Sequence, residues 1–280
     1  MTQTMIGKNA TLRSMIFSLP DGRTLRAYVA IVTAAGVLAA ALAATFGHGS
    51  GDAGLIAGLV LAGAVSERWK VGLFGDAHVS LSAAVLMAAG LAGGPRDIAI
   101  VAPLLAVAVN LGSVVPLYKT IFNAATYVLA SLAFLATVNI FVPQPDAGDW
   151  LHVVAPATAG VGVYFAVNAA LVAVAVVLAS GERVLDVVRG RYLWLLPNYL
   201  PIGAIAAAFL LGYDSIGAWA ILVFAGPAAA VQVALHLFAA VKRSGDERVQ
   251  EVEERMRIVE RELALARRLD GDGGARPHAA

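Results

Sequence analysis

The sequence predicts an all-α membrane protein: a polytopic transmembrane helix bundle of six to eight spans, best counted as eight, followed by a cytoplasmic coiled-coil helix. Of the 280 residues, 59% are hydrophobic and only 14% are charged, whereas a soluble domain carries about a quarter charged residues. The charges cluster near the N-terminus, in short loops and from Lys242 on. We therefore divide the chain into a cytoplasmic N-terminal segment (1–24), the bundle (25–243), a parallel coiled coil (244–269) and a disordered tail (270–280).

The N-terminal segment, "MTQTMIGKNATLRSMIFSLPDGR", is positively charged and has only a brief apolar stretch. No small-residue cleavage site follows it, so we interpret it as a cytoplasmic lead-in and not as a signal peptide. The chain contains no cysteine, which excludes disulfides, thiolate metal sites and cysteine nucleophiles.

Six apolar runs come close to or exceed the roughly 20 residues that a membrane-spanning helix needs. They are Ala27–Phe46, Ile98–Val115, Ile121–Phe141, Val153–Ala179, Leu193–Leu211 and Ala218–Val241. Two shorter runs, Ala53–Val65 and Leu81–Gly93, each give about 20 Å of helix against a hydrocarbon core of about 30 Å. Counting both short runs as crossings gives eight spans, and treating them as a hairpin that does not cross gives six.

The charges predict the orientation. With the N-terminus inside, the cytoplasmic side holds Lys8, Arg13, Arg23, Arg26, Arg68, Lys70, Lys119, Arg183, Arg189, Arg191 and the charges from Lys242 on. The outer side holds Asp52, Asp97, Asp146, Asp149 and Asp214, with Arg96 as its only basic residue. This positive-inside pattern predicts a multi-pass protein of the cell (inner) membrane with both termini in the cytoplasm. Eight crossings and six crossings give the same orientation.

The polar stretch "SERWKVGLFGDAHVSLS" separates the two short runs. Both halves alternate in polarity and Gly75-Asp76 is a turn signal, so we expect a small β-hairpin. One interpretation places this hairpin at membrane depth, where it offers Glu67, Arg68, Asp76 and His78 to a ligand. The other places it in the cytoplasm as a cap on the bundle, with Glu67 paired to Arg68 or Lys119.

Polar residues also recur inside the predicted spans. Lys119, Asn123, Tyr127 and Ser131 repeat every four residues and therefore share one helix face. Tyr164 and Asn168 repeat this spacing in the next span, and Asn110 adds a polar side chain in the previous one. The stripe is either interhelical hydrogen bonding, worth about 0.6 kcal/mol per contact, or a polar pocket with Lys119 at its cytoplasmic mouth. The candidate ligand-binding residues are thus Glu67, Arg68, Asp76, His78, Asn110, Lys119, Asn123, Tyr127 and Asn168.

The segment "SGDERVQEVEERMRIVERELALARRL" predicts the coiled coil. Ser244 and Glu247 fit a capping box, and the apolar residues then take heptad positions a and d: Val249, Val252, Met256, Val259, Leu263 and Ala266. Across a parallel dimer the g and e positions pair opposite charges: Arg248 with Glu253, Arg255 with Glu260, and Glu262 with Arg267. A parallel homodimer is therefore favoured over a single solvated helix held by Glu251/Arg255 and Glu253/Arg257.

The order "SERWKVGLFGDAHVSLSAAVLMAAGLAGGPRDIAIVAPLLA" and "YKTIFNAATYVLASLAF" resembles the multi-helix membrane sensor regions at the N-termini of bacterial signalling proteins with HD-GYP, diguanylate cyclase or histidine kinase outputs. The matching features are Glu67-Arg68, the run from Val79 to Ser82, Gly94-Pro95 and Phe122-Asn123, within residues 55–240. The order is also similar to the substrate-binding components of vitamin importers of the energy-coupling-factor type. The first resemblance implies a helical linker that passes a signal to an enzyme domain. Here the linker is followed only by the tail, so we expect no catalytic output.

These observations favour an integral membrane sensor-like or scaffold protein that dimerises through the coiled coil. The sequence has no zincin, Walker A or nucleophile-elbow motif, so we expect no enzyme, no cofactor and no metal. The expected partners are the lipid bilayer, a second copy of the chain, a cytoplasmic signalling protein and a small-molecule ligand, but no nucleic acid. The alternative is a small-molecule transporter or a substrate-binding membrane component with a polar intramembrane pocket.

Overall fold

The structure is a computed structural model that describes residues 22–68, 71–74, 77–79, 82–110, 115–143, 150–193, 196–224 and 255–257. The chain divides into one unit from Met1 to Ala230 and a second from Val231 to Ala280. In the second unit the description covers a helical turn at 255–257. The first unit holds α2 (Arg23–Phe46), α3 (Ala53–Arg68), β1 (Val71–Phe74), β2 (Ala77–Val79), α4 (Ser82–Gly93), α5 (Pro95–Asn110), α6 (Leu117–Phe141), α7 (Trp150–Ser180), α8 (Val184–Val187), the π-helix η2 (Val188–Tyr192), α9 (Leu196–Ile216) and the 3₁₀-helix η4 (Gly217–Trp219).

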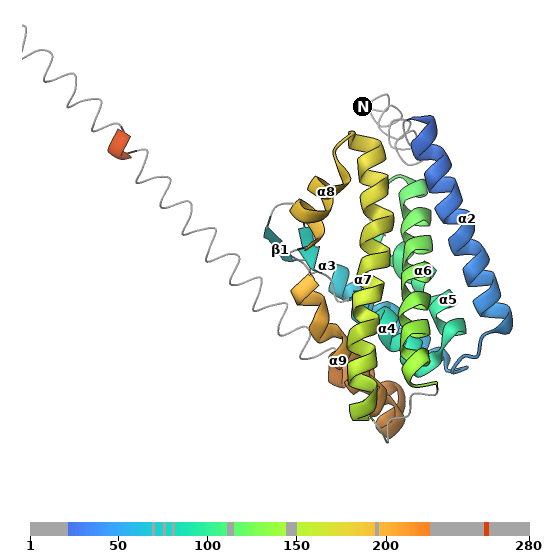
Figure 1. Ribbon diagram of the computed structural model, residues 1–280. Coiled ribbons are helices and arrows are strands. Elements are labelled where there is room, and N and C mark those ends of the chain that lie inside the picture. The colour runs from blue at the N-terminus through green and yellow to red at the C-terminus, as the bar shows by residue number, and fades with distance from the viewer. Residues whose placement is uncertain are drawn as a thin grey trace, which may run out of the picture. The chain divides into compact units, whose positions relative to one another are not determined.

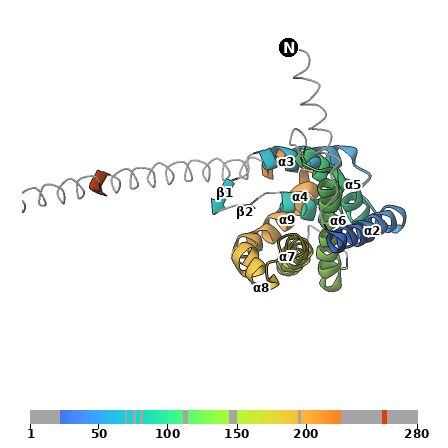
Figure 2. The same ribbon diagram turned by 90° about the horizontal axis from the view of Figure 1, so that it is seen from above.

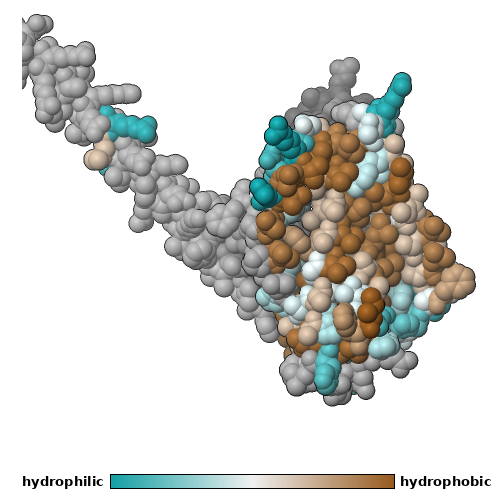
Figure 3. All heavy atoms as spheres, viewed as in Figure 1, coloured by the Kyte–Doolittle hydropathy of each residue, from teal (hydrophilic) through white to brown (hydrophobic). Residues whose placement is uncertain are grey.

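The described part of the chain contains four helices that are long and apolar enough to cross a membrane: Arg23–Phe46, Leu117–Phe141, His152–Ser180 and Pro201–Phe224. Much of their surface faces outward, and Figure 3 shows hydrophobic side chains over the middle of the bundle with hydrophilic ones towards its two ends. A bilayer is the solvent that such a surface needs. The protein is therefore an α-helical membrane protein, apart from one short hairpin.

The long helices pack closely, with α2, α6 and α9 running in one direction and α7 running back (Figure 1). The α2 and α6 helices run the same way, because Tyr28 lies against Phe122 and Gly36 lies against Ala125. A methyl group on Gly36 would overlap the Cβ of Ala125, so only glycine allows this approach. The α7 helix returns beside α6, and α9 runs down again along α7, where Gly203 abuts the backbone of Thr158.

The shorter helices α3, α4 and α5 form a second layer. Ser50, just before α3, bonds Asp97 at the start of α5, and Gly63 further along α3 lies against Leu105 of α5, so these helices run in parallel. The α4 helix runs back between them and ends at Gly93, which also abuts Asp97. Figure 2 shows α4 in the interior, between α9 and α6.

The α4 helix is enclosed by protein on all sides. Its 12 residues span about 18 Å, and all but Ala92 are buried, including fully enclosed Leu86 and Met87. A helix that is apolar all round is buried in this way because it has no face that suits water. It therefore belongs to the core, where protein surrounds it.

The predicted hairpin between α3 and α4 is confirmed. Its strands are antiparallel, with Val71 opposite Val79 and Gly72 opposite His78, and an irregularity follows at Phe74. The predicted turn residues Gly75 and Asp76 lie outside the described residues.

Several helix boundaries differ from the predicted ones. The α5 helix begins at Pro95, three residues before the predicted start, because Gly94 has a φ of 88° and proline suits the first helical position. The α9 helix begins at Leu196, three residues after the predicted start, and a π-helical segment, Val188–Tyr192, occurs earlier in the chain. The described structure thus confirms a helical membrane protein with one short hairpin, while eight crossings and the coiled coil stay predictions.

Candidate functional site

Polar side chains from several helices gather at one depth of the bundle, close to the start of α4. The reference point is Phe134 of α6, against which both Gly90 of α4 and Gly160 of α7 pack. About eight residues of helix, or about 12 Å, lead from Gly90 to Ser82 on α4. A similar length leads from Phe134 to Tyr127 on α6 and from Gly160 to Asn168 on α7. These polar residues therefore lie about the same distance from Phe134, counted along each helix.

Three more polar residues complete this group. Ser131 lies one turn from Tyr127 on the same face of α6, and Tyr164 lies one turn from Asn168 on α7. The ring of Tyr164 stacks on Tyr199 of α9 at a centroid distance of 6.5 Å. We call Ser82, Tyr127, Ser131, Tyr164, Asn168 and Tyr199 the polar layer.

Two oxygen atoms of the polar layer are buried without a hydrogen-bond partner in the described structure: Ser131 Oγ and Asn168 Oδ1. Ser131 is completely buried. A buried polar group without a partner costs about 1–3 kcal/mol, and such groups are few in native proteins. Two of them on neighbouring helices therefore mark the polar layer as a candidate binding site.

The start of α4 adds to the chemistry of this region. The first N–H groups of a helix have no partner within the helix, and at α4 they lie beside Ser82, which is only 6% exposed. The rest of the surroundings is apolar and aromatic, since Tyr199 also contacts the Phe165 ring at 5.0 Å. Hydrogen-bonding groups surrounded by apolar and aromatic side chains are typical of small-molecule sites.

The structure places part of the predicted stripe in this layer. Tyr127 and Asn168 belong to it, and Ser131 of the same stripe is its most buried member. Asn123 lies one turn away on α6, where its carbonyl oxygen accepts a hydrogen bond from the Thr126 hydroxyl. Lys119 is exposed near the start of α6 and lies outside the layer.

The other predicted ligand-binding residues do not enter the layer as described. The Asn110 side chain at the end of α5 donates a hydrogen bond to the Ala106 carbonyl at 2.9 Å. Glu67 and Arg68 lie in the last turn of α3 and His78 lies in β2, but their side chains are outside the described structure, as is all of Asp76. Tyr164 was part of the predicted stripe, next to Asn168. Tyr199 and Ser82 were not predicted as site residues. The polar "PNYLP" motif within an apolar run could have indicated Tyr199.

A second polar group, which we call the acidic end, joins α3, α5 and α9. The Asp97 carboxylate accepts hydrogen bonds from the hydroxyl and the N–H of Ser50, and the Ser50 hydroxyl oxygen accepts one from the Asp52 N–H. The Asp52 side chain accepts N–H bonds from Gly54 and Leu55 and thereby caps α3. Its second oxygen accepts the Tyr213 hydroxyl of α9 at 3.1 Å.

Asp97 is only 2% exposed and fits because two glycines leave room for it. A methyl group on either Gly49 or Gly93 would overlap its carboxylate oxygens. The adjacent Arg96 does not pair with Asp97, since its Nε donates to the Ala44 carbonyl at the end of α2. We interpret the acidic end as a structural contact that holds the ends of α2, α3, α5 and α9 together.

Hydrogen bonds also favour the ionised form of Asp52. The Leu55 N–H lowers the pKa of the Asp52 carboxyl below its usual value, and the Tyr213 hydroxyl and the Gly54 N–H lower this pKa further, while burial partly opposes them. The described residues include no group of three or more His, Cys, Asp or Glu that could hold a metal ion.

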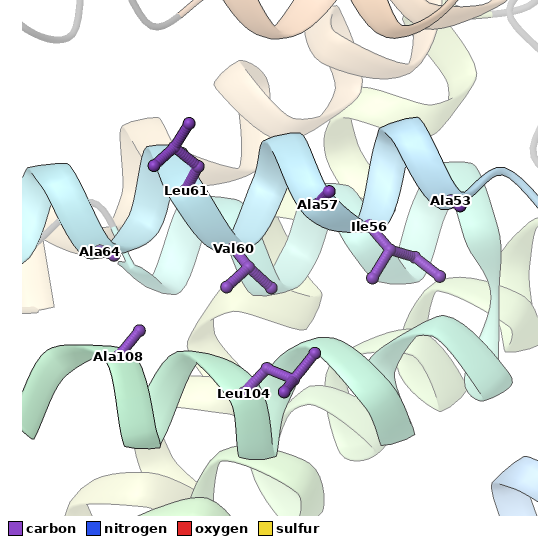
Figure 4. A pocket seen from close by; sticks show the side chains of 8 residues that line it. All are labelled: Ala53, Ile56, Ala57, Val60, Leu61, Ala64, Leu104 and Ala108. Carbon is purple, nitrogen blue, oxygen red and sulfur yellow. The ribbon is translucent and has the colours of Figure 1, made fainter. Parts of the chain in front are cut away.

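A groove of about 530 Å³ runs between α3 and α5 (Figure 4). Its lining is wholly apolar and consists mostly of alanine and leucine side chains: Ala53, Ile56, Ala57, Val60, Leu61, Ala64, Leu104 and Ala108. Leu61 and Leu104 are 65% and 47% exposed. Because no polar side chain reaches this groove, it has no group that could orient a polar ligand.

The fold and the polar layer define the class of protein: a helical membrane protein with a buried polar cluster at the end of a half-length helix. Comparison of the chain with protein-family models, with curated proteins and with solved structures finds no match. The resemblances noted in the sequence therefore stay predictions.

Proposed function

We propose that the protein is a multi-pass membrane sensor that binds a small polar molecule in the polar layer and is not itself an enzyme. The observation that carries the proposal is the pair of buried, unpartnered oxygens, Ser131 Oγ and Asn168 Oδ1. A ligand with hydrogen-bond donors offsets the cost of burying them. The Tyr164 and Tyr199 rings provide apolar contact for the remainder of such a ligand.

The second part of the proposal is the output. We propose that both termini lie in the cytoplasm and that the C-terminal helix pairs with a second copy to form a parallel coiled coil. The turn at 255–257 is helical, and Met256, predicted at heptad position a, is 62% exposed there. An exposed methionine on a helix is available for a partner helix. Ligand binding then acts by favouring one of two arrangements of this dimer.

Ser131→Ala tests the binding site. Without a ligand the substitution removes an unpartnered buried hydroxyl, so we expect the melting temperature to stay the same or to rise. If Ser131 binds a ligand, native mass spectrometry should show a bound small molecule in the wild type. The bound fraction should be at least tenfold smaller in the variant. Ser215→Ala, at an exposed serine that donates to the Leu211 carbonyl, is the matched control. Equal occupancy in wild type and S131A would contradict the site.

Cysteine crosslinking tests the output. Because the chain has no cysteine, Val252→Cys or Val259→Cys introduces the sole thiol, and at a d position it should form a disulfide between copies in membranes. Glu254→Cys, on the opposite helix face, is the control and should crosslink far less. No preference for Val252 over Glu254 would remove the parallel dimer from the proposal.

The second candidate function is that of a small-molecule transporter or a transporter's substrate-binding component. The observation that favours it is the pair of short helices α3 and α4, joined by the β1–β2 hairpin, since interrupted helices mark substrate sites in transporters. Protein in sealed vesicles separates the two functions. A transporter accumulates the co-purifying molecule inside the vesicle, whereas a sensor binds it without uptake and changes the crosslinking yield at Val252→Cys.

A further inference from the structure

The connection between α7 and α9 is an amphipathic segment at one end of the bundle. Gly181, with a φ of 74°, ends α7, and α8 and η2 then form nine consecutive helical residues, Val184–Tyr192. Nine residues make about 13 Å of helix, too little to cross a bilayer. The segment instead lies beside α7, as Figure 1 shows for α8.

One side of this segment is fixed to the bundle and the other is open. Val187 is completely buried, whereas Val184 and Leu185 are 51% and 64% exposed. Arg183 and Arg189 are exposed as well, and Arg189 follows Leu185 by four residues, so these two share a helix face. Basic and large apolar side chains thus occur together on the open side.

The arginines of this side are available to an external partner. Neither the Arg183 nor the Arg189 guanidinium forms a hydrogen bond or an ion pair with the part of the chain that the structure describes. Of the residues whose side chains the structure describes, this end carries five basic ones (Arg23, Arg26, Lys119, Arg183 and Arg189), against Glu182 and Asp186. The opposite end carries Asp52, Asp97 and Asp214, so the two ends differ in charge.

We propose that α8 and η2 form a binding surface for anionic phospholipid headgroups. The four long apolar helices place this end of the bundle at the boundary between hydrocarbon and headgroups. There, Val184 and Leu185 insert among the upper acyl carbons, as in amphipathic interfacial helices. Arg183 and Arg189 bind lipid phosphates through paired N–H donors. This surface is separate from the polar layer and does not depend on its function.

Lipid quenching tests the surface. Leu185→Cys in the otherwise cysteine-free chain carries a fluorescent label, and the protein is placed in phosphatidylcholine vesicles with one fifth phosphatidylglycerol. Bromination of either lipid near the headgroup then reports which lipid lies next to α8. We expect brominated phosphatidylglycerol to quench several-fold more per molecule than brominated phosphatidylcholine, and high salt to weaken this preference.

Charge variants complete the test. The double variant Arg183→Gln, Arg189→Gln should lose the preference for phosphatidylglycerol, since each arginine contributes about fivefold to it. The double variant Arg183→Lys, Arg189→Lys should keep most of this preference. Arg96→Gln removes one positive charge at the acidic end and should leave the preference unchanged. Equal quenching by both lipids in the wild type, or an unchanged preference in the folded glutamine variant, would overturn the proposal. If the glutamine variant does not fold, loss of the wild-type preference at high salt decides the question.

Discussion

At the scale of single residues, the bundle contains two kinds of buried polar group, one with hydrogen-bond partners and one without. Asp97 is buried but has its hydrogen bonds, whereas Ser131 Oγ and Asn168 Oδ1 are buried without them. Satisfied groups of the first kind hold a fold together, and unsatisfied groups of the second kind lower stability unless something else binds them. This difference separates the structural contact at the acidic end from the candidate site in the polar layer.

The hydrogen bonds to Asp52 predict a pH dependence of stability. Because the folded pKa of Asp52 lies below its unfolded value of about 3.9, the ionised form stabilises the fold above that value, and this contribution is lost as the pH falls through the folded pKa. We expect Asp52→Asn to lower the melting temperature at pH 7, and the difference from wild type to shrink below about pH 4.

Thermal unfolding in detergent at several pH values measures this effect. Asp214→Asn, an exposed carboxylate at the same end without a hydrogen bond among the described residues, is the control and should change the pH profile little. A difference between wild type and D52N that stays constant down to pH 3 would contradict the role of the Asp52 hydrogen bonds.

At the scale of helices, the position of α4 predicts which leucines matter. Leu86 on α4 is fully buried, whereas Leu61 on α3 is 65% exposed. Leu86→Ala should lower the free energy of unfolding by about 2–5 kcal/mol because it leaves a cavity. The chemically identical Leu61→Ala should cost far less, since Leu61 faces the surroundings. Denaturant unfolding of both variants measures the difference, and equal costs would show that α4 is not enclosed.

The approach of α2 to α6 gives a second prediction at this scale. Gly36→Leu introduces a side chain where even a methyl group would overlap Ala125, so we expect a loss of stability of about 1–3 kcal/mol or more, from overpacking. A methyl group on Gly162 in α7 would meet no neighbouring atom within 4 Å in the described structure, which makes Gly162→Leu the matched control. Comparable melting temperatures for the two variants would argue against the close packing of α2 on α6.

The helices themselves were predictable from the sequence, and the polar contacts between them only in part. Apolar runs located every long helix, and Gly75-Asp76 located the hairpin, because both signals are local. The stripe on α6 was predictable for the same reason, since four-residue spacing fixes a face. The contact of Ser50 with Asp97 joins residues 47 positions apart, and the stacking of Tyr164 on Tyr199 joins two helices, so neither has a local signal.

At the scale of the whole molecule, the two ends of the bundle differ in charge, and this predicts its orientation. By the positive-inside rule we expect the end with Arg183 and Arg189 in the cytoplasm and the acidic end outside. Ser215 and Ser180 are exposed at opposite ends. In intact cells a membrane-impermeant maleimide should label Ser215→Cys and leave Ser180→Cys unlabelled until the membrane is opened. The reverse result would invert the topology.

The enclosure of α4 also constrains how the protein is made. Its most extensive packing is with α9, which the ribosome completes roughly a hundred residues later, at about 5–20 residues per second. For several seconds of synthesis, this half-length helix therefore lacks a large part of its final surroundings. We therefore expect α4 to reach its final packing only after α9 has been made.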